Sequence, residues 1–389
     1  MRRRACGFVL AVAVLCRGFG AASPEQSLRE AARGSGMLIG AAVRPEQFSE
    51  AAYASTLARE FNMVEPEDAL KWEVVHPERE SFDFSPGDQV VDFASRHDMK
   101  VRGHTLVWHR QNPKWLTEGN YTSGELAEIL EKHIKAVVGH YRGKIFAWDV
   151  VNEAFDELRP GELRHTIWRD QPGIGAVGGG GAAGYEPRTS SNPARSELAA
   201  RSSQQPYFYI ERCFRWAHEA DPQALLFYND AEAEAVNPKS DAIYAMVRDF
   251  RERGVPIDGV GFQMHIAKLH ADIASISANI QRFTALGVQV HITELDVALP
   301  VDAEHNSRPE DLQSQADIYA QIAAACLSHR LSHSGCTAIQ TWGFTDKYSW
   351  IGSHSKQTEG AALLFDRTYR TKPAYLRLRN ALAARLATQ

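Results

Sequence analysis

Short apolar segments alternate with longer amphipathic segments along most of the chain, and this alternation limits the possible folds more than any other feature. The apolar segments are predicted strands, which begin at Met37, Phe61, Met99, Lys144, Ala224, Asp258, Val288 and Thr337. The amphipathic segments, such as those from Leu126, Tyr209 and Ser314, repeat apolar residues every three or four positions, as helices do. Near-continuously apolar strands are typical of parallel sheets. The pattern therefore predicts an α/β fold, a closed (β/α)8 TIM barrel formed by one domain.

A doubly wound parallel sheet is the structural alternative. It would normally carry a glycine-rich phosphate-binding turn after an early strand. The sequence shows no such turn, so the barrel is favoured.

The net charge and the N-terminal residues limit the possible classes of protein. The 389 residues carry a formal charge of -5, which does not favour nucleic acid as a partner. The basic start at 1–4, the apolar run at 8–15 and the small residues at 20–22 predict a signal peptide over residues 1–22. We expect export of residues 23–389 to the cell exterior or the periplasm, without a membrane span. The alternatives are a buried N-terminal helix and lipidation at Cys16.

Residues 171–205 interrupt the alternation, because they are rich in Gly, Ser and Pro and show no periodicity. This composition predicts an inserted, mobile loop after the fourth strand. It is either a passive surface insertion or a flap on the face that carries the active site of a barrel.

The mature chain would keep three cysteines. Cys326 and Cys336 flank a short polar connection, and export would allow them to form a disulfide. Cys213 lies in a helical pattern and is predicted to be buried. We expect no metal and no cofactor.

The predicted strands end in polar and aromatic residues that a barrel core does not need. These residues are Glu65, Glu67, Asp68, Lys71, Trp72, His104, Trp108, His109, Asn152, Glu153, Gln263, His265, Glu294, Asp296, Trp342 and Trp350. Convergence of such groups on one face is typical of a ligand site. Glu153 and Glu294, at the ends of the fourth and seventh strands, suit glycoside hydrolysis. One of them would donate a proton and need a raised pKa, whereas the other would stay ionised.

Several of these residues have plainer interpretations. The two glutamates could be structural ion pairs, and Glu67 with Lys71 could be a surface pair. His104 and His109 could bind a metal, but the sequence offers no third ligand at a fitting spacing. Further residues with core or loop-holding interpretations are Asp230, His291, Trp342 and Trp350.

Seven segments together resemble glycoside hydrolase family 10, the endo-β-1,4-xylanases, from about residue 38 to 382. They are "FNMVEPEDALKWEVVHP", "VRGHTLVWHRQNPKWL", "WDVVNEAF", "FYND", "GVGFQMHI", "HITELDV" and "TWGFTDKYSW". The resemblance implies a TIM barrel that hydrolyses xylan and xylo-oligosaccharides with retention of configuration through a covalent glycosyl-enzyme. Its catalytic carboxyl groups would lie about 5–5.5 Å apart.

The resemblance also implies a role for each matching residue. Glu153 would be the general acid/base and Glu294 the nucleophile. Asn152 would bind the 2-hydroxyl of the cleaved sugar, and His265, supported by Asp296, would keep Glu294 ionised. The remaining residues of the reacting subsite would be His104, Trp108, Gln263, Trp342 and Trp350. The next sugar would be held by Glu67, Asp68 and Lys71, and the bridge between Cys326 and Cys336 matches many members of the family.

The sequence departs from the family pattern at Asp68, which replaces the usual Asn, at Ala231, where many members have Tyr, and in the insertion. These departures concern sugar binding beside the reacting subsite and on the leaving-group side. The leading interpretation is a secreted, monomeric endo-1,4-β-xylanase. The alternatives are a barrel glycosidase that acts on β-glucan or aryl β-glycosides, and an inactive barrel that binds glycans or inhibits an enzyme.

Overall fold

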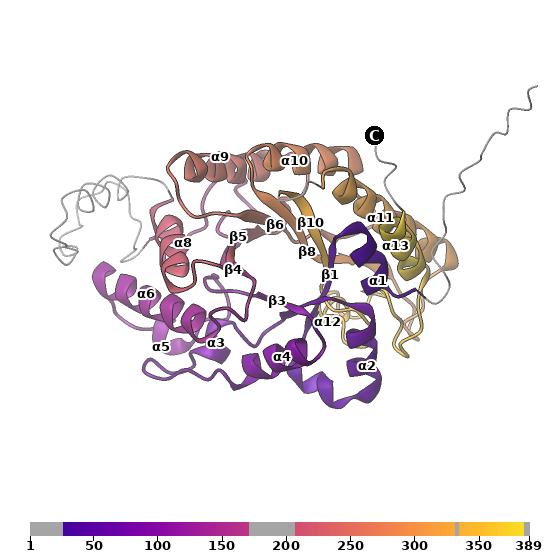
Figure 1. The fold of residues 1–389 in the computed structure, drawn as a ribbon, viewed down its shortest axis with the longest axis horizontal. Coiled ribbons are helices and arrows are strands. Elements are labelled where there is room, and N and C mark those ends of the chain that lie inside the picture. The colour runs from indigo at the N-terminus through magenta and orange to yellow at the C-terminus, as the bar shows by residue number, and fades with distance from the viewer. Residues whose placement is uncertain (1–25, 171–206, 331–333, 385–389) are drawn as a thin grey trace, which may run out of the picture.

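The computed structural model describes residues 26–170, 207–330 and 334–384, and eight parallel strands close into a barrel at its centre (Figure 1). The barrel strands are β1 (Leu38–Val43), β2 (Met63–Pro66), β3 (Lys100–Gly103), β4 (Ala147–Asn152), β5 (Leu225–Asp230), β6 (Gly259–Phe262), β8 (Gln289–Val297) and β10 (Gly335–Thr341). Each pairs in parallel with its neighbours, and the pairing of β10 with both β1 and β8 closes the ring. The predicted (β/α)8 barrel is therefore confirmed.

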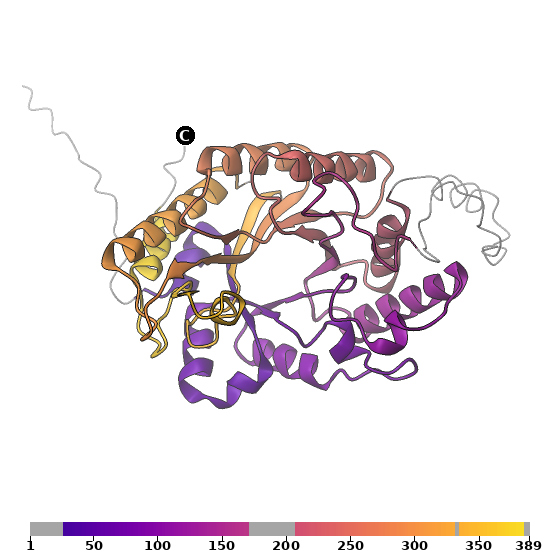
Figure 2. The ribbon, with the colours of Figure 1, turned by 180° about the vertical axis from the view of Figure 1, so that it is seen from behind.

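Helices surround the barrel on all sides in both face views (Figures 1 and 2). The longer ones are α1 (Leu28–Ser35), α2 (Ala51–Glu60), α4 (Ser85–Arg96), α6 (Ser123–His140), α8 (Phe208–Ala220), α9 (Pro238–Glu252), α10 (Ile273–Ala285), α11 (Pro309–Ser328) and α13 (Pro373–Ala383). Shorter elements are η1 (Pro45–Ser49), α3 (Trp72–Val75), α5 (Lys114–Thr117), α12 (Ile351–His354), β7 (His265–Ile266), β9 (Leu299–Pro300) and β11 (Glu359–Gly360). Within the described ranges, every helix is too short or too polar to cross a membrane.

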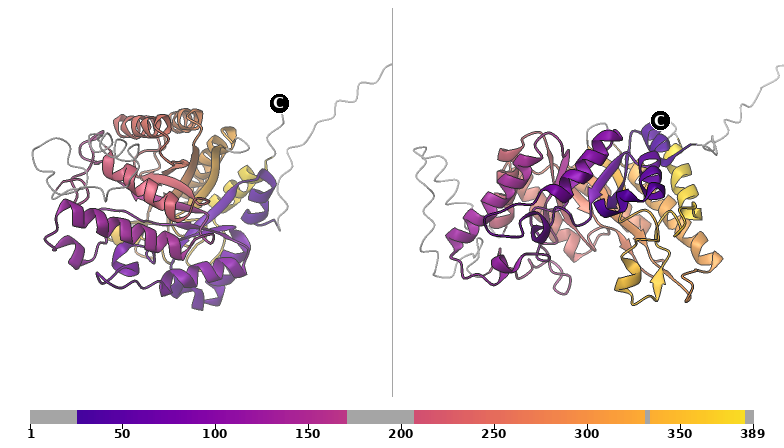
Figure 3. Two further views of the ribbon diagram at one scale, coloured as in Figure 1. Left: turned by 60° about the vertical axis from the view of Figure 1, so that its left-hand side comes forward. Right: turned by 90° about the horizontal axis from the view of Figure 1, so that it is seen from below.

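Local sequence explains where these helices begin. The hydroxyl of Thr122 accepts from the backbone of Glu125, whose side chain accepts from Thr122 in return, and this capping box starts α6. The helix then buries residues such as Leu130, Ile134 and Val137 against the barrel. At the two ends of the described chain, α1 and α13 pack side by side (Figure 3).

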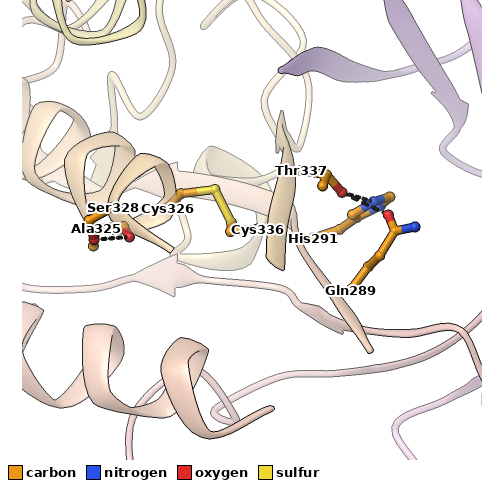
Figure 4. The surroundings of a disulfide bond; sticks show 7 residues. All are labelled: Gln289, His291, Ala325, Cys326, Ser328, Cys336 and Thr337. Atoms are coloured by element: carbon orange, nitrogen blue, oxygen red, sulfur yellow. Dashed lines mark hydrogen bonds between the residues drawn. A yellow bond between two sulfur atoms is a disulfide. The ribbon is translucent and has the colours of Figure 1, made fainter. Parts of the chain in front are cut away.

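A disulfide joins Cys326 near the end of α11 to Cys336 in β10, with their Cα atoms 5.1 Å apart (Figure 4). The predicted bridge is therefore confirmed. Cys213 is a free thiol and fully buried, also as predicted.

The third strand is shorter than the sequence suggests. The segment "MKVRGHTLVW" predicts a strand as far as Trp108, but β3 ends at Gly103. Beyond Gly103 the regular pairing with β4 is interrupted, and it resumes where the amide of Leu106 donates to the carbonyl of Asp149 and Val107 forms an isolated parallel bridge with Val151. The predicted signal peptide, residues 1–22, and the predicted insertion, residues 171–205, lie outside the described residues.

Candidate active site

The predicted site residues gather at the carboxyl ends of the barrel strands. Asn152 ends β4 and Glu153 follows it, whereas Glu294 lies within β8. Gln263 follows β6, and Trp342 follows β10. Because parallel strands present their carboxyl ends on one face, side chains that are far apart in sequence meet there.

Glu153 is a nearly buried carboxylate held by neutral donors. The indole Nε1 of Trp108 donates to its Oε2 at 2.9 Å, and Nε2 of Gln263 donates to its Oε1 at 3.0 Å. Burial favours a higher pKa for Glu153, but the hydrogen bonds from Gln263 and Trp108 outweigh it and lower the pKa. The expectation of a raised pKa is therefore wrong for the free protein, because the sequence did not show two donors converging on this carboxyl.

Glu294 is held by an amide and a histidine. Nδ2 of Asn229 donates to Oε1 at 2.8 Å, and Nε2 of His265 lies 3.2 Å from Oε2. The other ring nitrogen of His265 lies 3.0 Å from Asp296, which also accepts from the indole of Trp350 at 2.8 Å. Burial alone would lower the pKa of His265, but the two carboxylates raise it well above its usual value. A cationic His265 therefore faces Glu294, as the resemblance implied.

Amide side chains connect the two glutamates. Asn152 lies 2.9 Å from the amide of Asn229 and 3.2 Å from that of Gln263. Gln263 and Asn229 in turn contact Glu153 and Glu294, respectively. Asn229 was not among the predicted site residues, although its place in "FYND" at the end of a strand was a usable signal.

A buried charge network lies next to Glu294, and of its members the sequence interpretation named only Glu65 and His104. Arg102 is fully buried and pairs with Asp149 and with Glu65, the latter at 3.3 Å. Burial raises the pKa of Glu65 to about 8 in spite of His104 and Arg102. Burial favours a lower pKa for His104, but Asp149 and Glu65 raise it. The visible signal was Arg102, a charge inside an apolar strand.

One group of side chains has the spacing of a metal site. Ligand atoms of Glu65, His104 and Glu294 lie within 4.8 Å of one another. This corrects the expectation that His104 has no partner ligands. Arg102 contacts Glu65, and His265 contacts Glu294, so cations of the protein already neutralise these carboxylates. The donor set therefore does not suit a divalent cation.

Four charged residues form the outer part of the site. Arg44 pairs with Glu67 at 2.6 Å and with Asp68 at 3.1 Å, and Asp68 also binds Lys71 at 3.1 Å. Glu67 and Lys71 are buried, so they are not the surface pair of the alternative interpretation. Burial favours a higher pKa for Asp68, but Lys71 and Arg44 lower it, which keeps Asp68 anionic.

Lys71 connects this outer part to the aromatic walls. Its Nζ lies 4.9 Å from the ring centre of Trp108 and 5.7 Å from that of Trp342. Trp342 packs edge-on against His104, with ring centres 5.4 Å apart, and Trp350 contacts His265 at 5.1 Å. The structure thus brings all twelve predicted catalytic and binding residues into one connected set.

The remaining candidates play structural parts. His291 is buried, and its two ring nitrogens contact Arg102 at 2.7 Å and Thr337 at 3.0 Å (Figure 4 shows the second contact). His109 lies 3.8 Å from Glu153, and burial together with Arg164 lowers its pKa to about 4. Asp230 is fully buried and pairs with Lys239 at 2.7 Å.

Comparison with known proteins identifies the family of this site. The profile described as glycosyl hydrolase family 10 matches residues 27–177 and 194–381. The chain belongs to glycosyl hydrolase family 10. The part left out of the match, residues 178–193, falls within the predicted insertion.

Xylanases from two bacteria resemble the chain over most of their length. Endo-1,4-beta-xylanase B of Thermotoga neapolitana is 40% identical over 334 residues, which are 86% of this chain and 84% of that protein. Beta-1,4-xylanase of Dictyoglomus thermophilum is 38% identical over 330 residues, which cover 83% and 82%, respectively.

Solved structures of family 10 enzymes share the fold. Native xylanase 10B from Thermotoga maritima superposes with a TM-score of 0.77 at 40% identity, covering 92% of this chain and 98% of that one. Xylanase 10B from Thermotoga petrophila RKU-1, in complex with xylobiose, gives 0.78 at 39% identity and covers 93% and 98%. The chain is therefore a glycoside hydrolase with the barrel of its family.

Proposed function

We propose that the protein is a secreted, monomeric endo-1,4-β-xylanase that cleaves internal bonds of xylan with retention of configuration. The observation that carries the proposal is the pair of buried glutamates at one barrel mouth, which the amides of Gln263, Asn152 and Asn229 connect and which have different electrostatic neighbours. Two relatives that are named xylanases match the chain over more than four fifths of their own length. One solved relative is a complex with xylobiose.

Glu294 has the setting that a nucleophile needs. The cation on His265 and the amide of Asn229 stabilise its anionic form. In the first step, an oxygen of Glu294 bonds to the anomeric carbon while the glycosidic bond breaks. The oxygen of the departing sugar takes the proton of Glu153, so that charge and atoms balance.

Glu153 would act twice. After the first sugar has left, its carboxylate removes a proton from water, and the water oxygen displaces Glu294 from the anomeric carbon. The low pKa of Glu153 in the free protein suits this second step. Substrate must raise the pKa for the first step. A bound sugar does so by replacing water around the carboxyl, because desolvation, already the largest influence, then increases.

The outer residues would bind the sugar chain. The rings of Trp108, Trp342 and Trp350 offer stacking surfaces, and Lys71 with Glu67 offers a donor and an acceptor for hydroxyls. Asp68, at the position that departs from the family, ties Lys71 and Arg44 in place. We expect it to act on the sugar through these two cations.

Replacement of the nucleophile tests the proposal. Glu294→Ala should lower xylan hydrolysis by about 10⁴-fold or more, measured as reducing sugar released, because a nucleophile has no substitute in this site. The wild type should release short xylo-oligosaccharides from xylan without comparable release from carboxymethyl-cellulose. Equal activity of variant and wild type would refute the mechanism, and preference for the cellulose would refute the substrate.

Secretion is tested separately. The basic and apolar N-terminal residues support removal of residues 1–22. N-terminal sequencing of the protein from the culture medium or the periplasm should then begin at residue 23. Retention of Met1 in a cell-associated protein would contradict this part of the proposal.

A further inference from the structure

The backbone at Glu153 has an unusual conformation that needs support. Its φ is 54°, in the left-handed region that side-chain-bearing residues rarely adopt. The amide of Glu153 donates to the carbonyl of Asn229 at 2.9 Å, and Nε of Arg164 donates to the carbonyl of Glu153 at 3.2 Å. The next amide, that of Ala154, donates to the hydroxyl of Tyr228 at 3.0 Å. Three neighbouring groups therefore fix the direction in which the Glu153 side chain leaves the strand.

Tyr228 differs from the other two supports because its hydroxyl is itself held from behind. It donates to a carboxylate oxygen of Asp230, and the other oxygen of Asp230 pairs with Nζ of Lys239 at 2.7 Å. Tyr228 and Asp230 are fully buried, and Lys239 is 3% exposed. Burial and Asp230 raise the pKa of Tyr228 well above its usual value, so the hydroxyl keeps its proton. The hydroxyl can thus accept from Ala154 and donate to Asp230 at the same time.

We propose that Tyr228, held by Asp230 and Lys239, is a positioning residue that aims the Glu153 carboxyl at the glycosidic oxygen. The contacts join β5 and α9 to the turn that carries Glu153, without touching Glu294 directly. The inference rests on the proposed function, because it assumes that Glu153 is the acid/base. It assigns a task to a buried charge pair that the chemistry of bond cleavage does not itself use.

Substrates with different leaving groups distinguish a displacement of Glu153 from other effects of a substitution, such as loss of folded enzyme. A dinitrophenyl leaving group departs without a proton, whereas a phenyl group or a sugar needs one. A small displacement of Glu153 should therefore slow cleavage only when a proton is needed. Loss of folded enzyme would instead lower the rates with every leaving group by the same factor.

The test uses Tyr228→Phe, which removes one hydroxyl and keeps the ring. With phenyl β-xylobioside, kcat/KM should fall about 10- to 100-fold, as expected when a reacting group shifts by about 1 Å. With dinitrophenyl β-xylobioside, kcat/KM should stay within about twofold of wild type. Azide, which attacks the glycosyl-enzyme without help from a base, should speed turnover of the dinitrophenyl substrate by the variant.

Two reference variants make the outcome decisive. Tyr141→Phe also removes a hydroxyl from a fully buried tyrosine, one that donates to the carbonyl of Phe84 at 3.2 Å, and should leave both rates at the wild-type level. Glu153→Ala should show the full dependence on the leaving group, which is a large loss of kcat/KM with the phenyl substrate and little loss with the dinitrophenyl substrate. The burst of dinitrophenolate counts active sites in each preparation, so rates refer to folded enzyme.

The two hypotheses can fail separately. If Glu153→Ala shows no dependence on the leaving group, the proposed role of Glu153 is wrong. If Glu153→Ala shows it but Tyr228→Phe slows both substrates equally, or slows neither, only the positioning role of Tyr228 is overturned.

Discussion

Gln263 should set the pKa of Glu153, and its replacement by Met tests this directly. Gln263 is 2% exposed, and its Nε2 donates to Oε1 of Glu153 at 3.0 Å. A hydrogen bond to a charged group contributes about 1.5–3 kcal/mol, and about 1.36 kcal/mol corresponds to one pKa unit. The hydrogen bond from Trp108 to Glu153 remains in the variant. In the wild type, Gln263 also stabilises the protonated form of Glu153 to some extent, which reduces its net effect on the pKa. We therefore take the lower end of the range, about one unit upward for Glu153 in Gln263→Met.

The direction of the change follows from the role of the proton. In the proposed mechanism the acid form of Glu153 is the active one in bond cleavage, so its pKa would define the alkaline limb of the pH profile of kcat/KM. Removal of a donor to the carboxylate destabilises the charged form and raises the pKa. The alkaline limb should therefore move to higher pH by about one unit in Gln263→Met. Weaker sugar binding would lower the height of the profile without moving its limbs.

The assay is kcat/KM on phenyl β-xylobioside across the pH range, with Gln315→Met as the control. Gln315 is also fully buried, but it donates to the carbonyls of Val297 and Ala361 and does not contact Glu153. Its replacement should leave both limbs in place. An unmoved alkaline limb in Gln263→Met, or one that moves to lower pH, would refute the view that this amide lowers the pKa of Glu153.

Three further predictions concern other parts of the molecule. Ala231→Tyr, next to the buried Asp230, should add a stacking surface on the leaving-group side and lower KM for xylohexaose; unchanged KM and product pattern would contradict this. Replacement of Cys326 and Cys336 by Ser should lower the free energy of unfolding by about 2–3 kcal/mol in denaturant titrations, and dithiothreitol should then have no further effect on the variant. His265 has a folded pKa raised well above the unfolded value of 6.5, so its stabilisation is complete below about pH 6.5 and is lost as pH rises through the folded pKa. Urea unfolding should accordingly show a larger gap between wild type and His265→Asn at pH 6 than at pH 10, and an equal gap would refute this assignment.

The barrel could be predicted from sequence because its signal is repeated and local. Apolar strands such as "KIFAWDVVNE" and amphipathic helices such as α6 each carry their own periodicity. The end of β3 was placed too late because "HTLVW" continues the apolar pattern, although the regular pairing with β4 is interrupted after Gly103. An interruption of this kind depends on contacts with β4, which local periodicity does not contain.

The site was predictable where its residues stand at strand ends, and not where it depends on pairing between strands. Glu153 and Glu294 stand out because a carboxylate at the tip of an apolar strand needs a partner or a task. The pairing of Arg102 with Glu65 and Asp149 depends on the barrel register, which places β2, β3 and β4 side by side. The donors that lower the pKa of Glu153 come from two separate strand ends, so the direction of that shift required coordinates.

The distribution of charge explains how two glutamates on one barrel face can play different parts. Glu294 has a cation in direct contact, His265, whose own charge is stabilised by Asp296. Among the described residues, the side chains within hydrogen-bond distance of the Glu153 carboxyl are the neutral groups of Trp108, Gln263 and Asn152.

Protonation of a carboxylate beside a fixed counterion sacrifices a charge–charge attraction. Protonation of a carboxylate held by neutral dipoles weakens only its hydrogen bonds. Desolvation by a bound sugar therefore favours protonation of Glu153, whose hydrogen-bond partners are neutral dipoles. On this reasoning the contact of His265 with only one of the two glutamates supports the proposed roles, in which Glu153 donates the proton and Glu294 attacks.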